Sequence, residues 1–137
     1  MKALLNLSIA LMAVTGVAFA VMKYWMKSDD PFAVVNHPLQ PYALDAHVLL
    51  GPLALFAFGW TFAAHILPAL TKRAPKRATG IWTMVFIGLM VASGYLMQVS
   101  TGDAARKAFA IAHWISSGLF VAGYVAHLIP LGRANAR

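Results

Sequence analysis

Residues 45–68 read DAHVLLGPLALFAFGWTFAAHILP, a stretch that is apolar almost throughout yet carries a histidine near each end. The apolar run over residues 43–67 is long enough for a helix to cross a hydrocarbon layer of ~30 Å at ~1.5 Å per residue. An imidazole exposed to lipid is costly, so His47 and His65 are expected to face the protein interior. The stretch predicts a membrane helix with an interior-facing histidine, able to titrate or to bind a metal, near each end.

Three further apolar runs extend this prediction to the whole chain. They cover residues 3–26, 80–100 and 107–130 of a 137-residue sequence that is 61% hydrophobic and 11% charged. Four spans leave no room for a soluble domain, so we expect a single integral membrane domain over residues 1–137. Because most connections are short, the predicted fold is all-α, a transmembrane up-down-up-down four-helix bundle.

The first span also has features of a cleavable signal peptide, namely Lys2, an apolar run and the small residues around Ala18 and Ala20. Its apolar run continues to Tyr24 and Trp25, an aromatic pair typical of the membrane interface. We therefore expect a retained membrane anchor.

The formal net charge of +7 comes from basic residues at the span ends. Such a distribution argues against nucleic-acid binding. The densest group lies between the second and third spans, and the positive-inside rule makes that loop and both termini cytoplasmic, as in a multi-pass protein of the bacterial inner membrane. The basic residues inside are then Lys2, Lys72, Arg73, Lys76, Arg77, Arg133 and Arg137, and those outside are Lys23, Lys27, Arg106 and Lys107. The chain has no cysteine, which excludes disulfides, thiolate metal sites and covalently attached haem.

The second and fourth spans resemble each other. Residues 111–130 read IAHWISSGLFVAGYVAHLIP and, like residues 45–68, contain Ala-His near the start, two glycines, and Ala-His-x-x-Pro at the end. In an up-down bundle these two helices run parallel. The repeat predicts that they perform the same task, and their closing prolines, Pro68 and Pro130, are interpreted as markers of helix ends.

The spacing of the histidines sets their depths. His47 and His65 are 18 residues apart, which returns to the same helix face about 27 Å along the axis. His113 and His127 are 14 apart, about 40° from a common face and about 21 Å along the axis. We therefore expect His47 to pair with His113 near the outer surface and His65 with His127 near the inner one.

Two facing imidazoles at each of two depths suit haem iron, whose porphyrin supplies the other four nitrogens. Zinc would need more protein ligands at one point. The sequence thus predicts two non-covalent haem b groups. Glycines on the spans would give a flat macrocycle room, although ordinary close helix packing explains them equally well; the candidates are Gly16, Gly51, Gly59, Gly118 and Gly123.

The stretches AHVLLG and AAHILP, matched by AHWISSG and VAHLIP, resemble the four-helix, two-haem membrane cytochromes b, including cytochrome b561-like proteins. They are also similar to the haem-binding core of cytochrome b in bc complexes. The resemblance implies that His47 and His113 bind an outer haem b, and His65 and His127 an inner one. Some bacterial members take a ligand from the first helix, whereas the first span here has no histidine.

Haem iron with two histidine ligands has no open position, which favours electron transfer over oxygen chemistry. We expect a lipid-embedded subunit that passes electrons between the quinone pool and a periplasmic redox protein, dehydrogenase or cytochrome c subunit. Two alternatives stay open. One is a self-contained quinone-coupled oxidoreductase, of the superoxide oxidase or ferric reductase type, and the other is a haem-free membrane anchor or assembly subunit.

The first loop, about residues 27–42, faces outward in this topology. Its Asp29, Asp30 and His37 are candidates for partner docking or for groups near a quinone, although His37 is interpreted first as an ordinary loop residue. Asp45, two residues before His47, could accept a proton or cap the second span, and the cap is the preferred interpretation. Thr101, Gly102 and Asp103 are expected to end the third span and begin the fourth.

Overall fold

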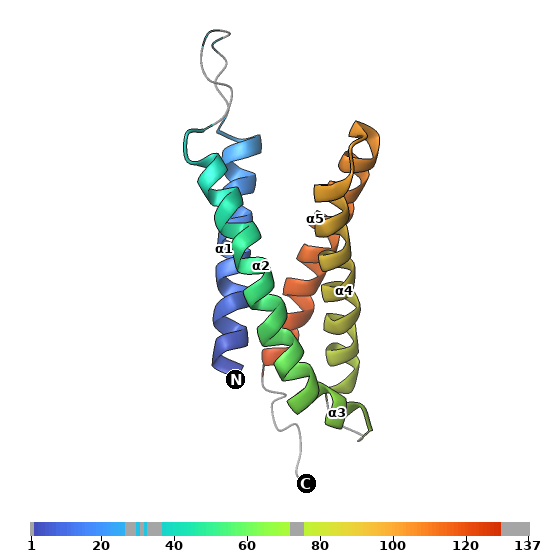
Figure 1. The fold of residues 1–137 in the computed structure, drawn as a ribbon. Coiled ribbons are helices and arrows are strands. Elements are labelled where there is room, and N and C mark those ends of the chain that lie inside the picture. Colours follow the sequence, from blue (N-terminus) through green and yellow to red (C-terminus); the bar gives the residue numbers. More distant parts are fainter. Residues whose placement is uncertain (1, 27–29, 31, 33–36, 72–75, 130–137) are drawn as a thin grey trace. The chain divides into compact units, whose positions relative to one another are not determined.

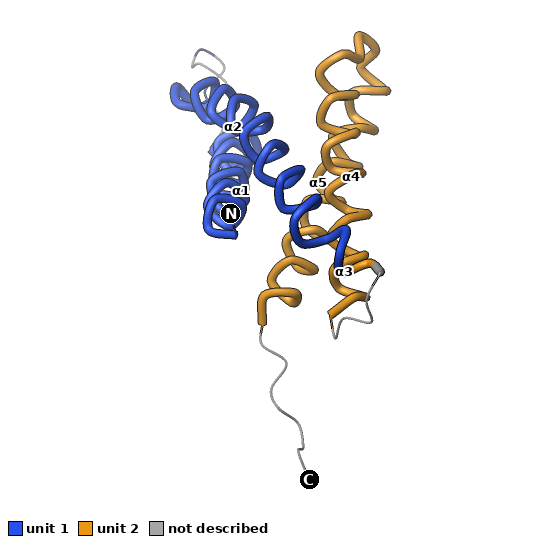
Figure 2. Tube along the Cα trace, turned by 60° about the horizontal axis from the view of Figure 1, so that its bottom comes forward, with its two compact units in different colours: residues 1–68 blue, residues 69–137 orange. Residues whose placement is uncertain are grey.

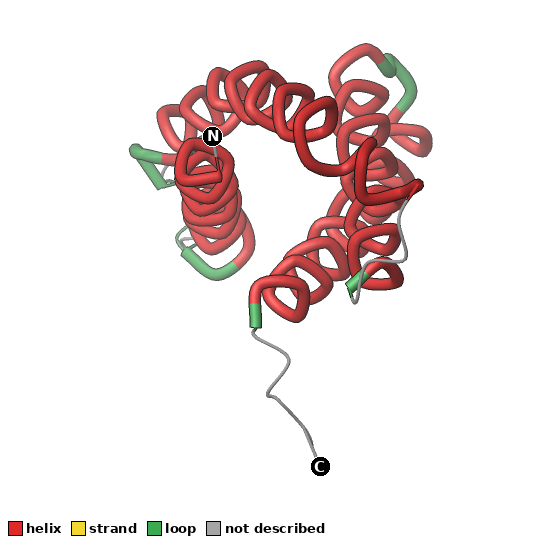
Figure 3. The backbone as a smooth tube through the Cα atoms, turned by 90° about the horizontal axis from the view of Figure 1, so that it is seen from below, coloured by secondary structure: helices red, strands yellow, loops and turns green. Residues whose placement is uncertain are grey.

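The computed structural model describes residues 2–26, 30, 32, 37–71 and 76–129. All regular structure in these ranges is helical, in agreement with the predicted all-α class (Figure 3). The elements in chain order are α1 (Lys2–Tyr24), α2 (Gln40–Thr61), the π-helical turn η1 (Phe62–Ile66), α3 (Leu67–Thr71), α4 (Arg77–Val99) and α5 (Asp103–Leu128).

Four helical segments are long and apolar enough to cross a membrane: Lys2–Tyr24, Gln40–Leu70, Arg77–Val99 and Asp103–Leu128, with mean hydropathies of 2.2, 1.7, 1.7 and 1.5. Large apolar side chains stand exposed along them, as shown by Leu49 and Val99, which are 76% and 72% exposed. In water such surfaces would be unfavourable, whereas lipid solvates them. The prediction of four spans is thereby supported, and the chain is described as a multi-pass membrane protein.

The chain divides into two compact units, Met1–Pro68 and Ala69–Arg137, each described by itself (Figure 2). In the first unit α1 packs against α2, and in the second α4 packs against α5. Both pairs are antiparallel. The start of α2 meets the later half of α1, where His47 contacts Thr15, and the end of α5 meets the start of α4, where His127 contacts Thr79. The arrangement of all four helices as one bundle stays a prediction.

Small hydroxyl side chains are among the most buried groups in both hairpins. Each donates to a carbonyl three or four residues earlier in its own helix: Ser8 to Leu5, Thr61 to Ala57, Ser93 to Leu89 and Met90, and Ser116 to Ala112 and His113. Such side chains satisfy their hydroxyls within one helix and let another helix approach closely.

The second hairpin also has an aromatic contact across its two helices. The Trp82 indole lies against Gly123 of α5, where a Cβ would come within 2.3 Å of the indole Cδ1. The indole Nε1–H donates to the Leu119 carbonyl at 3.1 Å, and the ring lies 4.5 Å from that of Phe86. Only glycine at position 123 leaves room for this ring, so the contact fixes the register of α4 against α5.

The start of α2 differs from the sequence expectation, whereas the junction between α4 and α5 agrees with it. Helix α2 begins at Gln40, with Pro41 in its first turn, where proline is favoured because its missing N–H would be unpaired there anyway. The prediction that Asp45 caps this helix is therefore wrong, since Asp45 lies within it. Helix α4 ends at Val99, and α5 follows Gly102 with Asp103 in its first turn, as the sequence predicted.

Pro68 does not end its helix, contrary to the interpretation of the closing prolines. The helical path continues through α3 to Thr71 after a π-helical turn over Phe62–Ile66 (Figure 1). In that turn the Leu67 N–H bonds to the Phe62 carbonyl, five residues back. Proline lacks an N–H and its ring collides with the carbonyl four residues earlier in an ordinary helix. The wider turn just before Pro68 accommodates both effects. Pro130 lies outside the described residues.

Several hydrogen bonds in the described part of the first loop join residues close together in the sequence. The Leu39 N–H bonds to His37 Nδ1 at 3.2 Å, and the Gln40 N–H bonds to the His37 carbonyl at 2.9 Å. His37 thus orders the entry to α2, consistent with an ordinary loop residue. The Phe32 N–H bonds to Asp30 Oδ1 at 2.9 Å, and Asp29 lies outside the described residues.

Candidate functional site

His47 lies near the start of α2 with its ring against the middle of α1. Its Nδ1 lies 3.1 Å from the Met12 carbonyl oxygen and 3.2 Å from Thr15 Oγ1. Beneath the ring is Gly16, where a Cβ would lie 3.0 Å from the imidazole Cε1. A side chain at position 16 would have to displace the imidazole, so the glycine creates the space that the ring occupies.

His113 has the same surroundings in the second hairpin. Its Nδ1 lies 2.9 Å from the Met90 carbonyl oxygen and 3.4 Å from Ser93 Oγ. The ring lies over Gly94, where a Cβ would come within 3.2 Å of Cε1. A carbonyl, a hydroxyl and a glycine on the neighbouring helix therefore hold both His47 and His113.

His127, one residue before the end of α5, shows a variant of this arrangement. Its Nδ1 lies 3.0 Å from Thr79 Oγ1, and a Cβ at Gly80 would lie 3.5 Å from Cε1, an ordinary contact distance. The carbonyl three residues before Thr79 belongs to Lys76, and it accepts the threonine hydroxyl at 3.0 Å. His127 is thus anchored through the hydroxyl.

The hydrogen bonds define which ring nitrogen carries the proton. A carbonyl oxygen can only accept, so Nδ1–H of His47 and of His113 must donate to Met12 and Met90. At His127 the Thr79 hydroxyl lies 3.0 Å from both Nδ1 and the Lys76 carbonyl oxygen and can donate or accept, so the contact is compatible with an Nδ1–H donor without requiring it. For His47 and His113 the donor is Nδ1–H. In a neutral imidazole this leaves the lone pair on Nε2. That tautomer is the one a metal ion binds through Nε2, with the other ring N–H held by a carbonyl or hydroxyl.

The residues that hold the rings form a short motif that sequence reasoning missed. The motif has five residues: a residue that supplies a carbonyl, two variable residues, a serine or threonine, and a glycine. Its three copies are Met12-x-x-Thr15-Gly16, Lys76-x-x-Thr79-Gly80 and Met90-x-x-Ser93-Gly94. The sequence did contain a signal for this motif. In α4 the hydroxyl-glycine pair occurs twice, 14 residues apart, which is also the spacing of His113 and His127 in α5.

The five predicted glycines differ in their surroundings. Gly16 lies beneath the His47 ring, and Gly123 accommodates Trp82, which is close packing between helices. At Gly51, Gly59 and Gly118 an added Cβ would meet nothing within 4 Å. Those three positions remain candidates for haem packing.

His65 differs from the other three histidines. It lies within the π-helical turn, its side chain is exposed, and no hydrogen bond to its ring is found among the described residues. A π-helical turn adds about one residue to the turn, which retards the later residues by up to about 100° around the axis. The spacing of 18 residues therefore does not by itself bring His65 to the face of His47.

Each predicted pair combines one histidine of the first unit with one histidine of the second. His47 and His65 belong to the first unit, and His113 and His127 to the second. The pairing of His47 with His113, and of His65 with His127, stays a prediction. Within the second unit, the two anchored rings are separated by 14 residues of one helix, about 21 Å along its axis.

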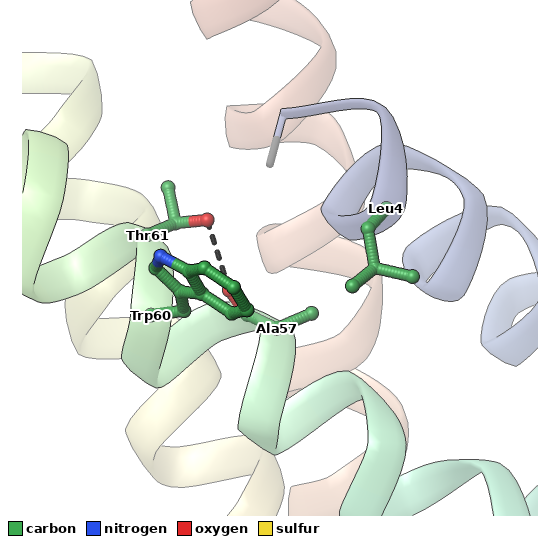
Figure 4. Close-up of a pocket in the computed structure, with 4 residues that line it drawn as sticks. All are labelled: Leu4, Ala57, Trp60 and Thr61. Atoms are coloured by element: carbon green, nitrogen blue, oxygen red, sulfur yellow. Dashed lines mark hydrogen bonds between the residues drawn. The ribbon is translucent and has the colours of Figure 1, made fainter.

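A pocket of about 130 Å³ lies in the first hairpin between the start of α1 and the end of α2 (Figure 4). It is lined by Leu4, Ala57, Trp60 and Thr61. The Thr61 hydroxyl donates to the Ala57 carbonyl at 2.9 Å. None of these four side chains is titratable, so the described residues give the pocket shape and an apolar surface rather than acid–base chemistry.

Among the described residues, no three histidine or carboxylate side chains gather closely enough to hold a metal ion by themselves. A metal held at His47, His113 or His127 would need other ligands, as a porphyrin provides. The chain matches no protein-family model, no curated protein and no solved structure. The chemistry of the anchored histidines is therefore the basis for assigning a function.

Proposed function

We propose that the protein is a membrane di-haem cytochrome b that transfers electrons between the quinone pool and a redox partner. The observation that carries the proposal is the shared environment of His47, His113 and His127, whose Nδ1 atoms all bond to a neighbouring helix. At His47 and His113 the Nδ1–H donates to a carbonyl, which satisfies the half-buried imidazole and also fixes the ring with Nε2 unprotonated. A ligand that binds iron through Nε2 needs that tautomer and that fixed orientation.

In this proposal His47 and His113 bind the outer haem b, and His65 and His127 the inner one. Haem supplies one-electron exchange between ferric and ferrous iron. The protein holds the rings by hydrogen bonds and glycine contacts, and its lipid-embedded helices keep water away. The outer pair has the stronger support, because both of its histidines are anchored, whereas His65 is exposed.

The sidedness is also part of the proposal. Lys76 and Arg77 at the start of α4 would lie in the cytoplasm of a bacterial cell by the positive-inside rule, with the His127 end of α5 beside them. His113 would then lie nearer the periplasm. Electrons would pass across the membrane between a quinone and a periplasmic partner such as a dehydrogenase or a cytochrome c subunit.

The test is an oxidised-minus-reduced absorption spectrum of the purified full-length protein, with haem quantified by pyridine extraction. Two b-type haems per chain are expected. His113→Ala and His127→Ala should each remove one, whereas His37→Ala should remove none, because His37 bonds only within its own loop among the described residues.

Two results would point elsewhere. A purified protein without b-type bands would leave the haem-free anchor as the better interpretation. Quinone-dependent oxidation of superoxide, or reduction of ferric iron by the isolated protein, would identify a self-contained oxidoreductase instead of an electron-transfer subunit.

A further inference from the structure

The Lys76 side chain joins the start of α4 to the end of α5 by bonding to backbone carbonyls at and just after His127. Its ammonium Nζ donates to the His127 carbonyl at 2.5 Å and also to the Ile129 carbonyl. Its own carbonyl accepts the Gly80 N–H and the Thr79 hydroxyl, each at 3.0 Å. Lys76 therefore contacts both the backbone of His127 and the hydroxyl that holds the His127 ring.

The side-chain bonds have a clear physical cause. The last carbonyls of a helix have no partner within it and carry partial negative charge, which a lysine ammonium neutralises. At α5 these carbonyls belong to the turn that contains His127. The lysine thus stabilises the backbone to which the imidazole is attached.

The same motif position is uncharged at the other two anchored histidines. Met12 stands three residues before Thr15, Met90 three residues before Ser93, and Lys76 three residues before Thr79. The carbonyls of both methionines accept from the histidine ring, and the carbonyl of Lys76 accepts the Thr79 hydroxyl. Of the three anchored histidines, His127 is therefore the one whose motif contains a cation, Lys76.

We propose that Lys76 positions His127 and raises the reduction potential of the haem that would be bound there. This inference rests on the proposed function. Ferric haem with two neutral imidazoles carries one positive charge more than ferrous haem, so a nearby cation disfavours the ferric form. Lys76 is half-buried, so water screens its charge only in part.

The experiment is a spectroelectrochemical titration of the full-length protein and its Lys76 variants. Lys76→Met gives the motif the residue found at the other two sites. It should lower the midpoint of one of the two haems, the one that His127→Ala removes, and leave the other in place. Lys76→Gln should lower the same midpoint, and Lys76→Arg should keep it near the wild-type value, because the charge is retained.

Lys107→Met is the control for a change in net charge. Lys107 is exposed, and it lies 20 residues before His127 in α5, about 30 Å along the helix. Its replacement should leave the His127 midpoint unchanged. A shift as large as that of Lys76→Met would overturn the proposal, and so would a Lys76→Arg protein that behaves like Lys76→Met.

A second measurement tests the positioning role without reference to electron transfer. Amide hydrogen exchange near the end of α5, at residues 125–129, should be faster in Lys76→Met than in the wild type. Unchanged exchange would contradict the positioning role. If the wild type lacks b-type haem altogether, the proposed function fails; if both haems are present and Lys76→Met moves neither midpoint, only the present inference fails.

Discussion

The contact between Trp82 and Gly123 gives the sharpest prediction about the architecture that holds His127. A methyl group at position 123 would lie 2.3 Å from the indole Cδ1 and 2.8 Å from Nε1. Ordinary contact begins at 3.4 Å, so the indole must move by about 1 Å. Such a movement would break or lengthen the 3.1 Å bond from Nε1–H to the Leu119 carbonyl.

The expected cost of Gly123→Ala follows from these distances. Overpacking of a tight contact costs about 1–3 kcal/mol, and a lost hydrogen bond between membrane helices about 0.6 kcal/mol. Alanine regains roughly 0.5–1 kcal/mol over glycine in a helix interior. We expect a net loss of about 1–3 kcal/mol in the free energy of unfolding.

The assay is reversible unfolding of the detergent-solubilised protein, followed by helical circular dichroism. Gly118→Ala is the matched control, because it lies in the same helix and a Cβ there meets nothing within 4 Å. That variant should be neutral or slightly stabilised. In a Trp82→Ala background the obstacle is absent, and Gly123→Ala should also become neutral or stabilising.

Two results would refute the reasoning. Equal stability of the Gly123→Ala and Gly118→Ala proteins would show that the indole does not occupy the space beside position 123. A loss that persists in the Trp82→Ala background would show that another group opposes the methyl. A loss of haem from Gly123→Ala without a loss of stability would instead support haem packing at this glycine.

Two further predictions concern the rings themselves. Thr79→Val should weaken haem binding at His127 more than Ser93→Ala weakens it at His113. The reason is that His113 keeps its 2.9 Å bond to the Met90 carbonyl, whereas His127 loses its 3.0 Å bond to the Thr79 hydroxyl. Haem content per chain measures the difference, and equal losses would contradict it. Gly94→Ala should displace His113, whose Cε1 would be 3.2 Å from the new Cβ, and change the electron paramagnetic resonance spectrum of one ferric haem. In Gly80→Ala the new Cβ would lie 3.5 Å from Cε1 of His127, an ordinary contact, so the spectrum of the haem at His127 should not change. Equal spectral changes in Gly94→Ala and Gly80→Ala would argue against the glycine contacts.

Much of the fold was accessible from local sequence. Four long apolar runs predict four helices, because backbone groups in hydrocarbon must be satisfied within the helix itself. The predicted ranges agree with the observed helices to within a few residues at most ends. The larger differences have local causes. Pro41 in its first turn lets α2 begin before its apolar run, and the π-helical turn before Pro68 lets the helix continue to Thr71. Helix α5 begins at Asp103, after Gly102, ahead of its apolar run.

The sequence by itself also singled out the four histidines, since a titratable side chain in an apolar run stands out without any knowledge of its neighbours. What only the tertiary structure decided is how they are held. The bonds from His47 to Met12, from His113 to Met90 and from His127 to Thr79 join residues 35, 23 and 48 positions apart. Those contacts depend on the register of two antiparallel helices, and hydropathy contains no information on register. Register is determined by close contacts such as that of Trp82 with Gly123, which exist only once the helices have packed.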